Sequence, residues 1–489
     1  MPTSAPLDTK EIAPEEEVTK RRFPRFALSG RAMARALAEF TGTASKQVAT
    51  QIRPDLPEED VDLMAQRISD CLAGKGGAVS ARASAADLGR AYLRLTPEGK
   101  ARFFDLLLDR FGPDVDAMRG AAADFASLEG GEDVAGAIAR MRQAMNSPRI
   151  ELFKQFNSLE EGIKFLVDMR ADLLGLLSGT PAFKIISDEL RDLLASWFDI
   201  GFLDLRQITW DAPASLLEKL VSYEAVHEIQ SWEDLKNRLD SDRRCYAFFH
   251  PNMPSEPLIF VEVALVSGMA DNVQTLLDEH APAGDPDNAD AAIFYSISNA
   301  QAGLAGVGFG NFLIKRVVDE LSHEFPNLKT FATLSPIPGF RRWLTKAIVG
   351  PMPLLNATEA QAIGTLTESR EPAAALLSYL DETDWHQDDI AAGILKPILM
   401  RLCAHYLLNE KRPSQPADRV VDPVGHFHLL NGARVERLNW LADRSANGLS
   451  QSAGMMVNYL YRMAEIDSNH ERYKGNGQVV SSSGVRSLV

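Results

Sequence analysis

The stretch AAIFYSISNAQAGLAGVGFGN, from Ala291 to Asn311, joins an apolar, strand-like segment to a glycine-rich turn. The residues that follow, Phe312-Leu313-Ile314-Lys315-Arg316-Val317-Val318, have the pattern of an amphipathic helix. A helix that starts at such a turn directs free backbone N–H groups and the positive end of its dipole toward one spot. The stretch therefore predicts an α/β unit with an anion site, suited to the pyrophosphate of a nucleotide or of coenzyme A.

The spacing of the glycines in this turn defines no standard phosphate motif. They stand at Gly303, Gly306, Gly308 and Gly310, where a missing Cβ lets the backbone approach a phosphate closely. The turn has no Gly-Lys-Ser/Thr and no clean GxGxxG pattern. A flexible connection from strand to helix is the alternative that the turn alone leaves open.

Strand patterns flank this stretch on both sides. Short apolar runs between turn residues predict strands at 245–250, 258–265, 292–298 and 328–334, with helices near 310–323 and 357–368. The third strand, the glycine turn, the helix and the fourth strand form a βαβ-like unit. Further strands are predicted at 426–430 and 434–441 around Asn431-Gly432, a hairpin signal, and a helix at 452–465.

Upstream, from Arg31 to about Phe198, the pattern is helical and strand signals are almost absent. Residues 84–87 and 158–161 resemble capping boxes that open helices. The predicted organisation is a multidomain α and α/β chain. Its parts are a mobile arm over 1–28, an all-α helical bundle over 29–200, an α/β domain over 201–467 and a disordered, polar tail over 468–489.

The composition limits which binding partners and which cellular compartment we expect for this protein. The 489 residues are 45% apolar, and the net charge of −16 disfavours nucleic acid and anionic membranes as partners. The cysteines, Cys71, Cys245 and Cys403, form no CxxC and no zinc pattern, so we expect neither a disulfide framework nor a structural zinc site. No signal peptide and no apolar run near the roughly 20 residues of a membrane span are recognised, which favours a cytoplasmic protein.

Three polar residues in the second half are candidates for chemistry. Ser335 opens the stiff turn Ser-Pro-Ile-Pro-Gly-Phe at the end of a predicted strand, where open α/β sheets bind ligands, although Ser-Pro also simply starts turns. His426 and His428 alternate on a predicted strand and so face the same side. One could act as acid or base, the two could bind a metal with a third ligand, or both could be bonded to backbone.

Charged residues near these segments have two interpretations each. Glu262 lies in an apolar strand and needs a partner or a raised pKa, either as catalytic support or in a structural ion pair. Cations follow the Ser-Pro turn and the glycine turn, where they either approach a phosphate or lie on solvated helix faces. They are Arg341, Arg342, Lys346, Lys315 and Arg316.

Four long segments, in order, resemble the malonyl-CoA decarboxylase family. They are HPNMPSEPLIFVEVAL at 250–265, FYSIS at 294–298, SPIPGF at 335–340 and FHLLNGA at 427–433. The resemblance extends from about residue 85 to 465 and implies an N-terminal helical domain that builds a homo-oligomer, a dimer or a tetramer. It also implies a C-terminal catalytic domain with the acyltransferase-like (GNAT) fold.

The same resemblance implies site residues. The family's active serine corresponds to Ser335, and its histidine to His428, with His426 as the other candidate; a further serine falls at Ser296. The loop that holds the coenzyme A pyrophosphate corresponds to Ala305, Gly306, Val307, Gly308, Phe309, Gly310 and Asn311. Gly308 stands where family members can carry a glutamate, so no loop carboxylate is expected to act. The C-terminus lacks Ser-Lys-Leu, which argues against peroxisomal targeting.

The implied reaction converts malonyl-CoA to acetyl-CoA and CO2. It needs no metal or organic cofactor, because the thioester carbonyl accepts the electrons as CO2 leaves. The site must supply donors for the enolate oxygen and a proton for the α-carbon. Two other functions remain open at this point: a coenzyme A-dependent acyltransferase on the same fold, and a non-catalytic helical scaffold.

Overall fold

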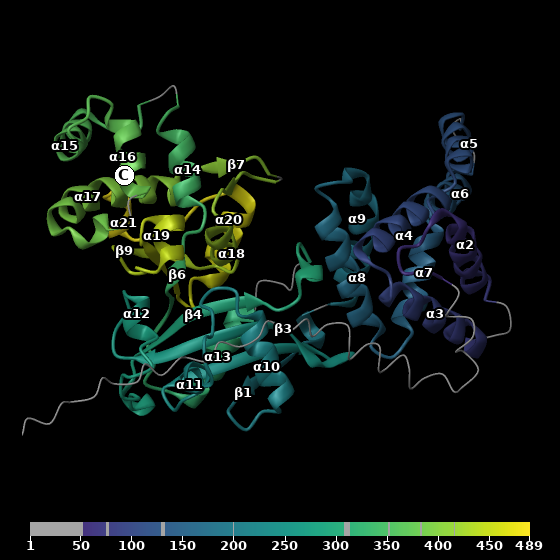
Figure 1. The fold of residues 1–489 in the computed structure, drawn as a ribbon, viewed down its shortest axis with the longest axis horizontal. Coiled ribbons are helices and arrows are strands. Elements are labelled where there is room, and N and C mark those ends of the chain that lie inside the picture. The colour runs from purple at the N-terminus through teal and green to yellow at the C-terminus, as the bar shows by residue number, and fades with distance from the viewer. Residues whose placement is uncertain are drawn as a thin grey trace, which may run out of the picture.

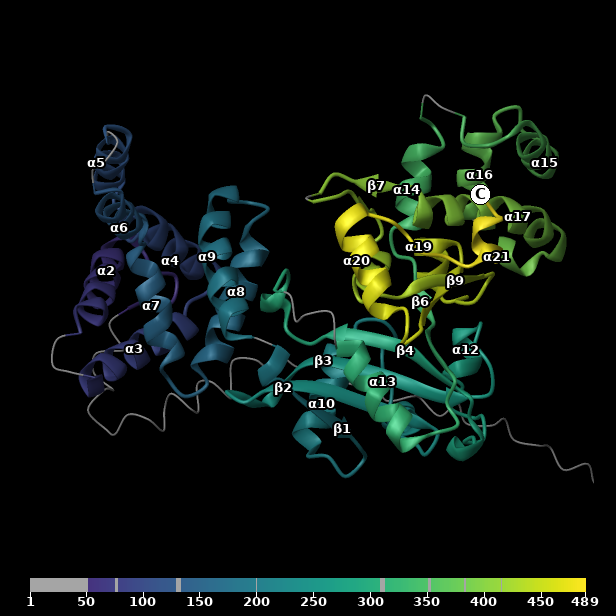
Figure 2. The same ribbon diagram turned by 180° about the vertical axis from the view of Figure 1, so that it is seen from behind.

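The computed structural model describes residues 52–74, 78–128, 133–198, 200–307, 313–350, 353–381, 384–414 and 416–489. The arm expected over 1–28 lies outside these residues. Figure 1 shows a helical N-terminal part, a twisted sheet beside it, and a helix-rich lobe that sits over the sheet and contains the C-terminus. Figure 2 shows the same arrangement from behind. The predicted combination of an α region with a mixed α/β region is confirmed.

Every regular element described between residues 52 and 198 is a helix. The α-helices are α2 Glu58–Ala73, α3 Ala78–Leu93, α4 Pro97–Arg110, α5 Val115–Ala126, α6 Val134–Met145, α7 Pro148–Asn157, α8 Gly162–Leu176 and α9 Lys184–Trp197. Aromatic side chains hold them together: Tyr92 packs edge-on against Phe103 and Phe165, with ring centroids 5.1 and 5.6 Å away. Such edge-to-face pairs stabilise beyond the apolar area that they bury.

Both predicted capping boxes are wrong. Residues 84–87 lie inside α3, because the alanine-rich segment already begins its helix at Ala78. Helix α8 does begin at the predicted place, but its first flanking residue, Glu161, has a left-handed backbone with φ 55° and makes no side-chain cap. Ser158 instead ends α7. A four-residue polar pattern does not show whether the helix before it has already ended.

The second half of the chain is built on an eight-stranded sheet of order β1-β2-β3-β4-β5-β10-β6, with β9 also paired to β10. The strands are β1 Asp204–Ile208, β2 Arg243–His250, β3 Met253–Val266, β4 Ala291–Asn299, β5 Thr330–Thr333, β6 Ser335–Pro336, β9 Arg434–Asn439 and β10 Met456–Tyr461. Only β4 and β5 pair in parallel, and helix α13, Leu313–Glu324, connects them. The predicted βαβ unit is therefore confirmed.

Helices cover both faces of the sheet. Buried residues of α13, such as Val317 and Leu321, belong to the same apolar core as Val261 and Val263 of β3. Helices α10, Ala214–Tyr223, and α11, Trp232–Arg238, pack with Phe260, whose side chain lies on the opposite face of that strand. The glycine turn and α13 therefore lie on one side of the sheet, and α10 and α11 on the other.

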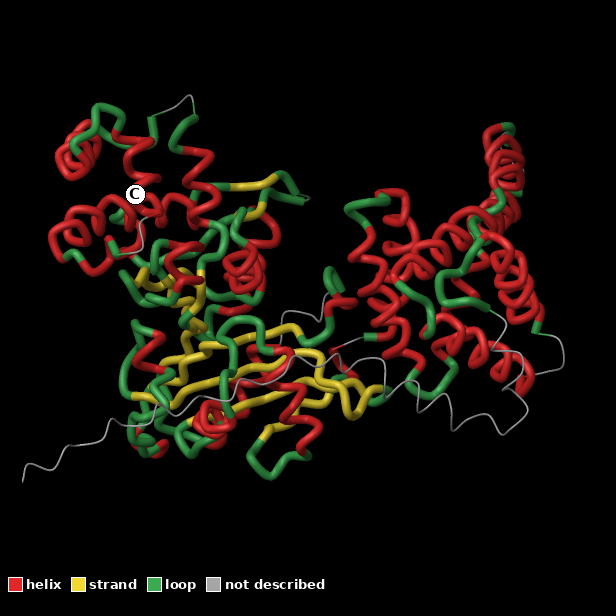
Figure 3. The backbone as a smooth tube through the Cα atoms, viewed as in Figure 1, coloured by secondary structure: helices red, strands yellow, loops and turns green. Residues whose placement is uncertain are grey.

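The lobe over the sheet contains most of the remaining helices. They are α14 Phe340–Ala347, α15 Ala357–Thr367, α16 Pro372–Asp381, α17 Asp389–Leu408, α18 Pro423–Leu430, α19 Ala446–Ser452, α20 Ile466–Asn476 and α21 Ser483–Arg486. A two-stranded sheet of β7, Lys411–Arg412, and β8, Arg419–Val420, adjoins them, and α12, Val273–Leu276, lies by the main sheet. Figure 3 shows how strands dominate the central layer and helices the parts around it.

Three predictions for the C-terminal region are wrong. Residues 426–430 belong to helix α18 rather than to a strand, so Asn431-Gly432 makes no hairpin. Within the predicted helix 452–465, residues 456–461 form strand β10, in which every residue is buried. A segment buried on all sides shows no alternation, so periodicity cannot tell strand from helix.

The tail predicted to be disordered is folded. Helices α20 and α21 occupy much of it, and Ser481 pairs with Val435 beside strand β9. Tyr473 and Val485 bury their side chains in the core. Two well-placed apolar anchors therefore order a polar segment that composition alone assigned to disorder.

Helix α17 corrects one more expectation. It is the one helix in the described part of the chain that is long and apolar enough, by length and composition, to cross a membrane. However, 56% of its most apolar window is buried inside the fold. Leu395, Leu399 and Leu402 pack in the main core, as in the core helix of a compact domain.

Candidate active site

Ser335 and His428 meet in the structure. The Oγ atom of Ser335 lies 3.1 Å from Nε2 of His428, and the two side chains are only 5% and 3% exposed. Ser335 is placed by β6, which pairs with β10 through Val457, and His428 is placed by α18. The pair predicted from sequence is thus brought into hydrogen-bond contact.

Asp422 ties the turn after Ser335 to the helix of His428. Its buried carboxylate accepts the N–H of Gly425 at 2.8 Å, which caps α18, and the O–H of Tyr406 at 3.3 Å. Gly339 lies against this group, since a Cβ there would come within 2.0 Å of the Tyr406 hydroxyl. Burial raises the pKa of Asp422. The Ser-Pro-Ile-Pro-Gly-Phe turn and α18 therefore share one buried anchor.

A directed chain of hydrogen bonds passes through His428. Ser335 donates its hydroxyl proton to Oγ1 of Thr333 at 2.8 Å, so its oxygen accepts from His428 Nε2. The opposite ring nitrogen, Nδ1, lies 2.7 Å from the hydroxyl of Tyr461, which then donates to it. The ring also stacks on Tyr459, with centroids 4.6 Å apart. This network assigns the neutral tautomer with a proton on Nε2.

Burial lowers the pKa of His428 to about 3. Removing an imidazolium from water is costly, and among the described residues no carboxylate hydrogen-bonds to the ring to compensate for it. His428 is consequently neutral at physiological pH. It can donate a hydrogen bond, or a proton, from Nε2 without carrying a charge.

The pair lies on the wall of a cavity of about 230 Å³. Strands β4 and β5 pair in parallel as far as Phe294 and Thr333, and the cavity lies beyond that point, between the end of β4 and Ser335. No charged side chain is among the described residues that line it. The lining consists of Val226, Ile259, Phe294, Tyr295, Ile297, Asn299, Ser335, Pro336, Pro423, Val424, Phe427 and His428.

His426 is not part of this cavity. Its Nδ1 atom lies 2.8 Å from the hydroxyl of Tyr473 in α20. The prediction that His426 and His428 face the same side is wrong, because the segment is a helix and residues two apart point in different directions around it. The structure thus places His428, and not His426, beside Ser335.

Ser296 is buried but does not line the cavity. Its hydroxyl lies 2.8 and 2.7 Å from the two carboxylate oxygens of Glu224. The register of β3 with β4 shifts beside it, so that Ser296 lies opposite Glu262 and Phe294 lies opposite Val263. Sequence reasoning missed Glu224, which follows α10 and carries no motif.

The predicted phosphate turn is described in part. Ala305, Gly306 and Val307 belong to the described residues, whereas Gly308, Phe309, Gly310 and Asn311 lie outside them. Gly306 has a left-handed backbone, with φ 76°. Ala305 and Gly306 are exposed at the surface.

The N-terminal helices reach this turn, which sequence reasoning also missed. A Cβ on Gly303 would lie 1.8 Å from the carbonyl oxygen of Val167 in α8, so glycine is needed there for close packing. Arg170 donates a hydrogen bond to the carbonyl of Gly303 at 2.5 Å. Arg191 of α9 has its Cδ atom 3.9 Å from the position of a Cβ on Gly306.

Glu262 forms an ion pair away from the cavity. It is fully buried, and its Oε2 lies 3.1 Å from Nη1 of Arg238, which also binds Asp234. Burial raises the pKa of Glu262 to about 7, and Arg238 opposes that rise. Of the two interpretations left open by the sequence, the structure shows the ion pair.

Most of the cations near the turns have structural partners. Arg341 binds Asp381 at 2.6 Å, Arg316 donates to the carbonyl of Leu203 at 2.7 Å, and Lys315 lies 3.6 Å from Asp467. Arg342 and Lys346 are exposed on α14. None of the five lines the cavity beside Ser335.

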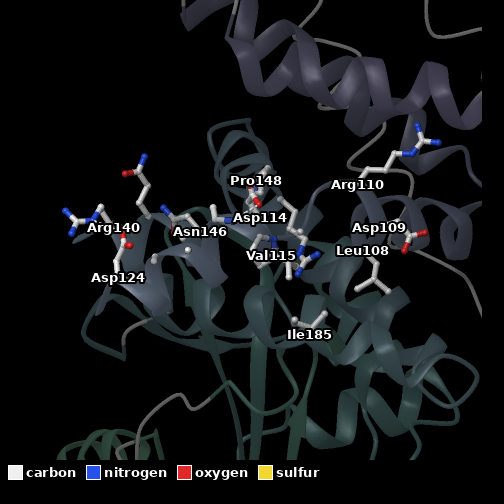
Figure 4. A pocket seen from close by; sticks show the side chains of 18 residues that line it. Leu108, Asp109, Arg110, Asp114, Val115, Asp124, Arg140, Asn146, Pro148 and Ile185 are labelled. Carbon is white, nitrogen blue, oxygen red and sulfur yellow. Dashed lines mark hydrogen bonds and ion pairs between the residues drawn. The ribbon is translucent and has the colours of Figure 1, made fainter. Parts of the chain in front are cut away.

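A larger cavity, of about 910 Å³, lies among the N-terminal helices (Figure 4). Residues such as Asp114, Arg140, Asn146 and Ile185 line it, with no serine, cysteine or histidine among the described lining. Volume therefore does not identify the reactive site here. In the described part of the chain no group of three His, Cys, Asp or Glu could hold a metal, and the three cysteines are free and buried.

Comparisons with known proteins find one family over both parts of the chain. Residues 201–489 match the family described as malonyl-CoA decarboxylase C-terminal domain, and residues 111–198 match the malonyl-CoA decarboxylase N-terminal domain. Mitochondrial malonyl-CoA decarboxylase of Anser anser anser is 37% identical over 406 residues, which cover 80% of each chain. The Mus musculus protein of the same name is 40% identical over 363 residues, covering 72% of this chain and 73% of its own.

Solved structures extend the likeness to the fold. The crystal structure of malonyl-CoA decarboxylase from Rhodopseudomonas palustris superposes with a TM-score of 0.80 at 41% identity. The one from Agrobacterium vitis gives 0.77 at 39% identity. Each comparison covers 87% of this chain and 99% of the solved chain. The likeness therefore includes both the helical part and the sheet.

Proposed function

The chain belongs to the malonyl-CoA decarboxylase family, and on that premise we propose that malonyl-CoA loses CO2 in the cavity lined by Ser335 and His428. The family's reaction is that of a carboxy-lyase, which gives acetyl-CoA and CO2. The observation that carries the proposed location is the contact of 3.1 Å between Ser335 Oγ and His428 Nε2 in an otherwise apolar cavity.

The lining suits the loss of CO2. The substrate carboxylate is charged and the leaving CO2 is neutral. Among the described lining residues there is no arginine or lysine that would stabilise the carboxylate and so oppose its loss. Apolar groups such as Ile297, Val424 and Phe427 surround that space instead. The electron pair of the broken bond moves to the thioester oxygen and gives an enolate.

Ser335 and His428 then divide two tasks. A donor is needed at the enolate oxygen, and a proton must reach the α-carbon. The Ser335 hydroxyl can turn from Thr333 to the substrate oxygen, and His428 donates the proton from Nε2. A neutral imidazole can do so because an enolate carbon is a far stronger base than the ring. As Nε2 loses its proton, the Tyr461 hydroxyl on Nδ1 is placed to pass its own proton to the ring, and a proton from water restores Tyr461 before the next turnover.

We also propose a more specific fold for the catalytic domain. We assign residues 201–467 to a GNAT-like catalytic domain, with the helical domain over 29–200 before it. Support comes from the mixed sheet, the parallel β4 and β5 that diverge at the cavity, and the glycine turn between β4 and α13. Coenzyme A would lie with its pyrophosphate at Ala305–Val307 and its thioester in the cavity. Helices α20 and α21 pack in the same core, so this domain extends beyond the boundary at residue 467 that the sequence predicted.

The test uses malonyl-CoA without any acyl acceptor. The wild-type protein should release CO2 and acetyl-CoA. Ser335→Ala and His428→Asn should each lower kcat, His428→Asn by roughly 10²–10⁴ as for lost acid–base catalysis. The double variant should be little worse than the worse single one, because groups acting as a unit are not additive.

His426→Asn is the matched control, since it changes the same residue type two positions away on α18. It should keep near-normal turnover, with malonyl-CoA binding retained in all variants. If only His426→Asn lost turnover, the proton donor would be His426 and not His428. Full activity of both histidine variants would exclude the Ser/His mechanism, and acetyl transfer to an added amine would favour the acyltransferase alternative.

We also propose that the N-terminal helices form a homo-oligomer. Helices α5 and α6 project from the bundle (Figure 1) and expose large apolar side chains: Val115, Phe125, Val134, Ile138 and Met145. Exposed apolar groups on one hairpin favour burial against another copy. Phe125→Ser and Ile138→Ser should then reduce the mass in light scattering. A wild-type mass near 53.7 kDa at micromolar concentration would contradict the oligomer.

A further inference from the structure

We propose that Glu224 is a positioning residue of the decarboxylase site: it fixes the segment 224–228 on strand β4 and thereby holds Val226 in the wall of the catalytic cavity. This inference rests on the proposed location of the reaction beside Ser335 and His428. In the described part of the chain Glu224 forms hydrogen bonds with neither of these two side chains, so it acts through the cavity wall that it holds.

The Glu224 carboxylate collects four donors. The hydroxyl of Ser296 lies 2.8 and 2.7 Å from its two oxygens, and that of Ser298 lies 3.2 Å from Oε2. The backbone N–H groups of Val226 and His227 donate to Oε1 at 2.7 and 2.8 Å. One carboxylate therefore joins two hydroxyls of β4 to the backbone just after α10.

A further hydrogen bond belongs to the same network, which we call the clasp: the bonds that join Glu224, Ser296 and Ser298 to the backbone of residues 225–227. The N–H of Ala225 donates to Oγ of Ser298 at 3.2 Å. Three consecutive N–H groups of the segment, at residues 225–227, are thus bonded either to Glu224 or to its serine partner. The segment has no regular secondary structure, so these bonds rather than a helix or a ladder set its position.

Val226 of this segment borders two hollows. Val226 lines the catalytic cavity together with Tyr295 and Ile297. Val226 also lines a second hollow, of about 710 Å³, whose lining includes Glu224 and His227. If the clasp opened, the wall would move and the catalytic cavity would join a polar, water-accessible space. Exclusion of water strengthens the donors that act on a developing enolate.

The composition of the clasp supports positioning over simple stability. Ser296 and Ser298 are each 1% exposed, and a buried hydroxyl without an acceptor is costly. Alanine at both positions would pack in the buried strand and would need no carboxylate as a hydrogen-bond acceptor. A fully bonded polar network instead defines one geometry, which an apolar contact would not. The network lies where the cavity wall must be fixed.

The first experiment compares Glu224→Gln with Glu256→Gln. Glutamine keeps the shape of Glu224, but its amide nitrogen cannot accept the N–H groups that the carboxylate accepts. We expect kcat for malonyl-CoA to fall about tenfold or more, because small misplacements near the reacting atoms are costly, with KM nearly unchanged. Glu256 is also a buried carboxylate, paired to Lys219 at 2.8 Å, but lines no part of the cavity. Glu256→Gln should keep normal kcat.

A selectivity measurement separates positioning from loss of stability. The α-methyl analogue of malonyl-CoA needs more room beside the α-carbon. A loosened Val226 wall should lower the ratio of kcat/KM for malonyl-CoA over that analogue several-fold, about 1 kcal/mol in discrimination. A variant that is merely less stable loses active protein and leaves the ratio unchanged. An unchanged ratio in a folded Glu224→Gln protein overturns the proposal.

A double-mutant cycle tests the route through Ser296. Glu224→Gln and Ser296→Ala should be non-additive in kcat, because both open the same clasp. Additive losses would mean that Ser296 acts on the substrate without Glu224, against the proposal. If Glu224→Gln does not fold, Ser298→Ala, which removes one donor to Glu224 and the acceptor of the Ala225 N–H, replaces it with the same expected fall in selectivity. Unchanged selectivity of the Ser298→Ala protein would then contradict the proposed positioning role of Glu224.

The controls separate this inference from the proposed site. Full activity of Ser335→Ala and His428→Asn would show that the site itself is misplaced. Large losses in those two variants, together with normal kcat and selectivity in Glu224→Gln, would leave the site in place and remove only the positioning role.

Discussion

The hydroxyl of Tyr461 lies 2.7 Å from Nδ1 of His428, on the side of the ring opposite to Ser335. Both ring nitrogens of His428 are therefore bonded, one to each of two strands of the sheet: Tyr461 belongs to β10 and Ser335 to β6. The ring cannot rotate without breaking both bonds. Tyr461 thus fixes the orientation and the tautomer that present a proton from Nε2.

Removing the Tyr461 hydroxyl should impair turnover. Tyr461→Phe keeps the buried ring but leaves Nδ1 without its donor, so the tautomer is no longer fixed. We expect kcat to fall roughly 10- to 100-fold, as for a group that orients another, which is less than the loss expected for the acid itself, and KM to change little. Tyr473→Phe is the matched control, because it removes the same kind of contact from His426. Equal kcat values for the two variants would contradict the role of Tyr461.

The stability of the fold should fall in acid because of His428. Its pKa is lowered from 6.5 to about 3 in the folded protein, so the unfolded chain binds one more proton between these values. The neutral ring's contribution is complete above about pH 6.5 and is lost as pH falls toward 3, by up to about 1.4 kcal/mol per pH unit. His428→Asn should therefore show a shallower fall of Tm between pH 7 and 5. Parallel Tm profiles would argue against a buried, neutral His428.

A side chain at Gly303 should disrupt the contact between the helical part and the sheet. The Cβ of Gly303→Ala would meet the carbonyl oxygen of Val167 at 1.8 Å, so backbone must move, at a cost of about 1–3 kcal/mol. Gly175→Ala, in the same helix α8 as Val167, meets nothing within 4 Å and should be neutral or slightly stabilising. Urea unfolding of both variants checks this. Equal midpoints would show that the two parts are not packed in this way.

Gly306 is a poor position for testing the phosphate turn. Its φ of 76° disfavours any side chain, so Gly306→Val would strain the backbone whether or not a ligand binds. The neighbouring Arg191 offers a better test, because it lies beside the turn and can be shortened without that strain.

Arg191→Ala should raise the KM for malonyl-CoA about three- to tenfold at low salt and leave kcat unchanged, as expected for one exposed cation near a phosphate. Lys184→Ala is the control, since Lys184 also pairs with Asp188 from the same helix but does not approach Gly306. Isothermal titration calorimetry with acetyl-CoA should show the same loss of affinity in the absence of turnover. Indistinguishable affinities would place the phosphates away from Arg191.

Local patterns predicted elements well where one face is buried and turns are explicit. Strands β2 to β5 and helix α13 appear near their predicted ranges, because apolar runs there end at glycine, proline or asparagine. Prediction failed at α18 and β10. Every residue of β10 is buried, and α18 carries apolar groups around the ring of His428, so neither segment shows its period.

The sequence by itself determined the family and the strand–turn–helix order around Gly303, and it singled out Ser335 together with two candidate histidines, His426 and His428, because each of these signals lies in residues that are neighbours in the chain. Tertiary structure alone decided which histidine faces Ser335, since α18 turns His426 toward Tyr473. It also decided that Glu224 binds Ser296 and that Gly303 packs on Val167. Such contacts join segments separated by up to 136 residues in the chain, and only the packing of helices against a sheet brings their side chains within hydrogen-bond distance.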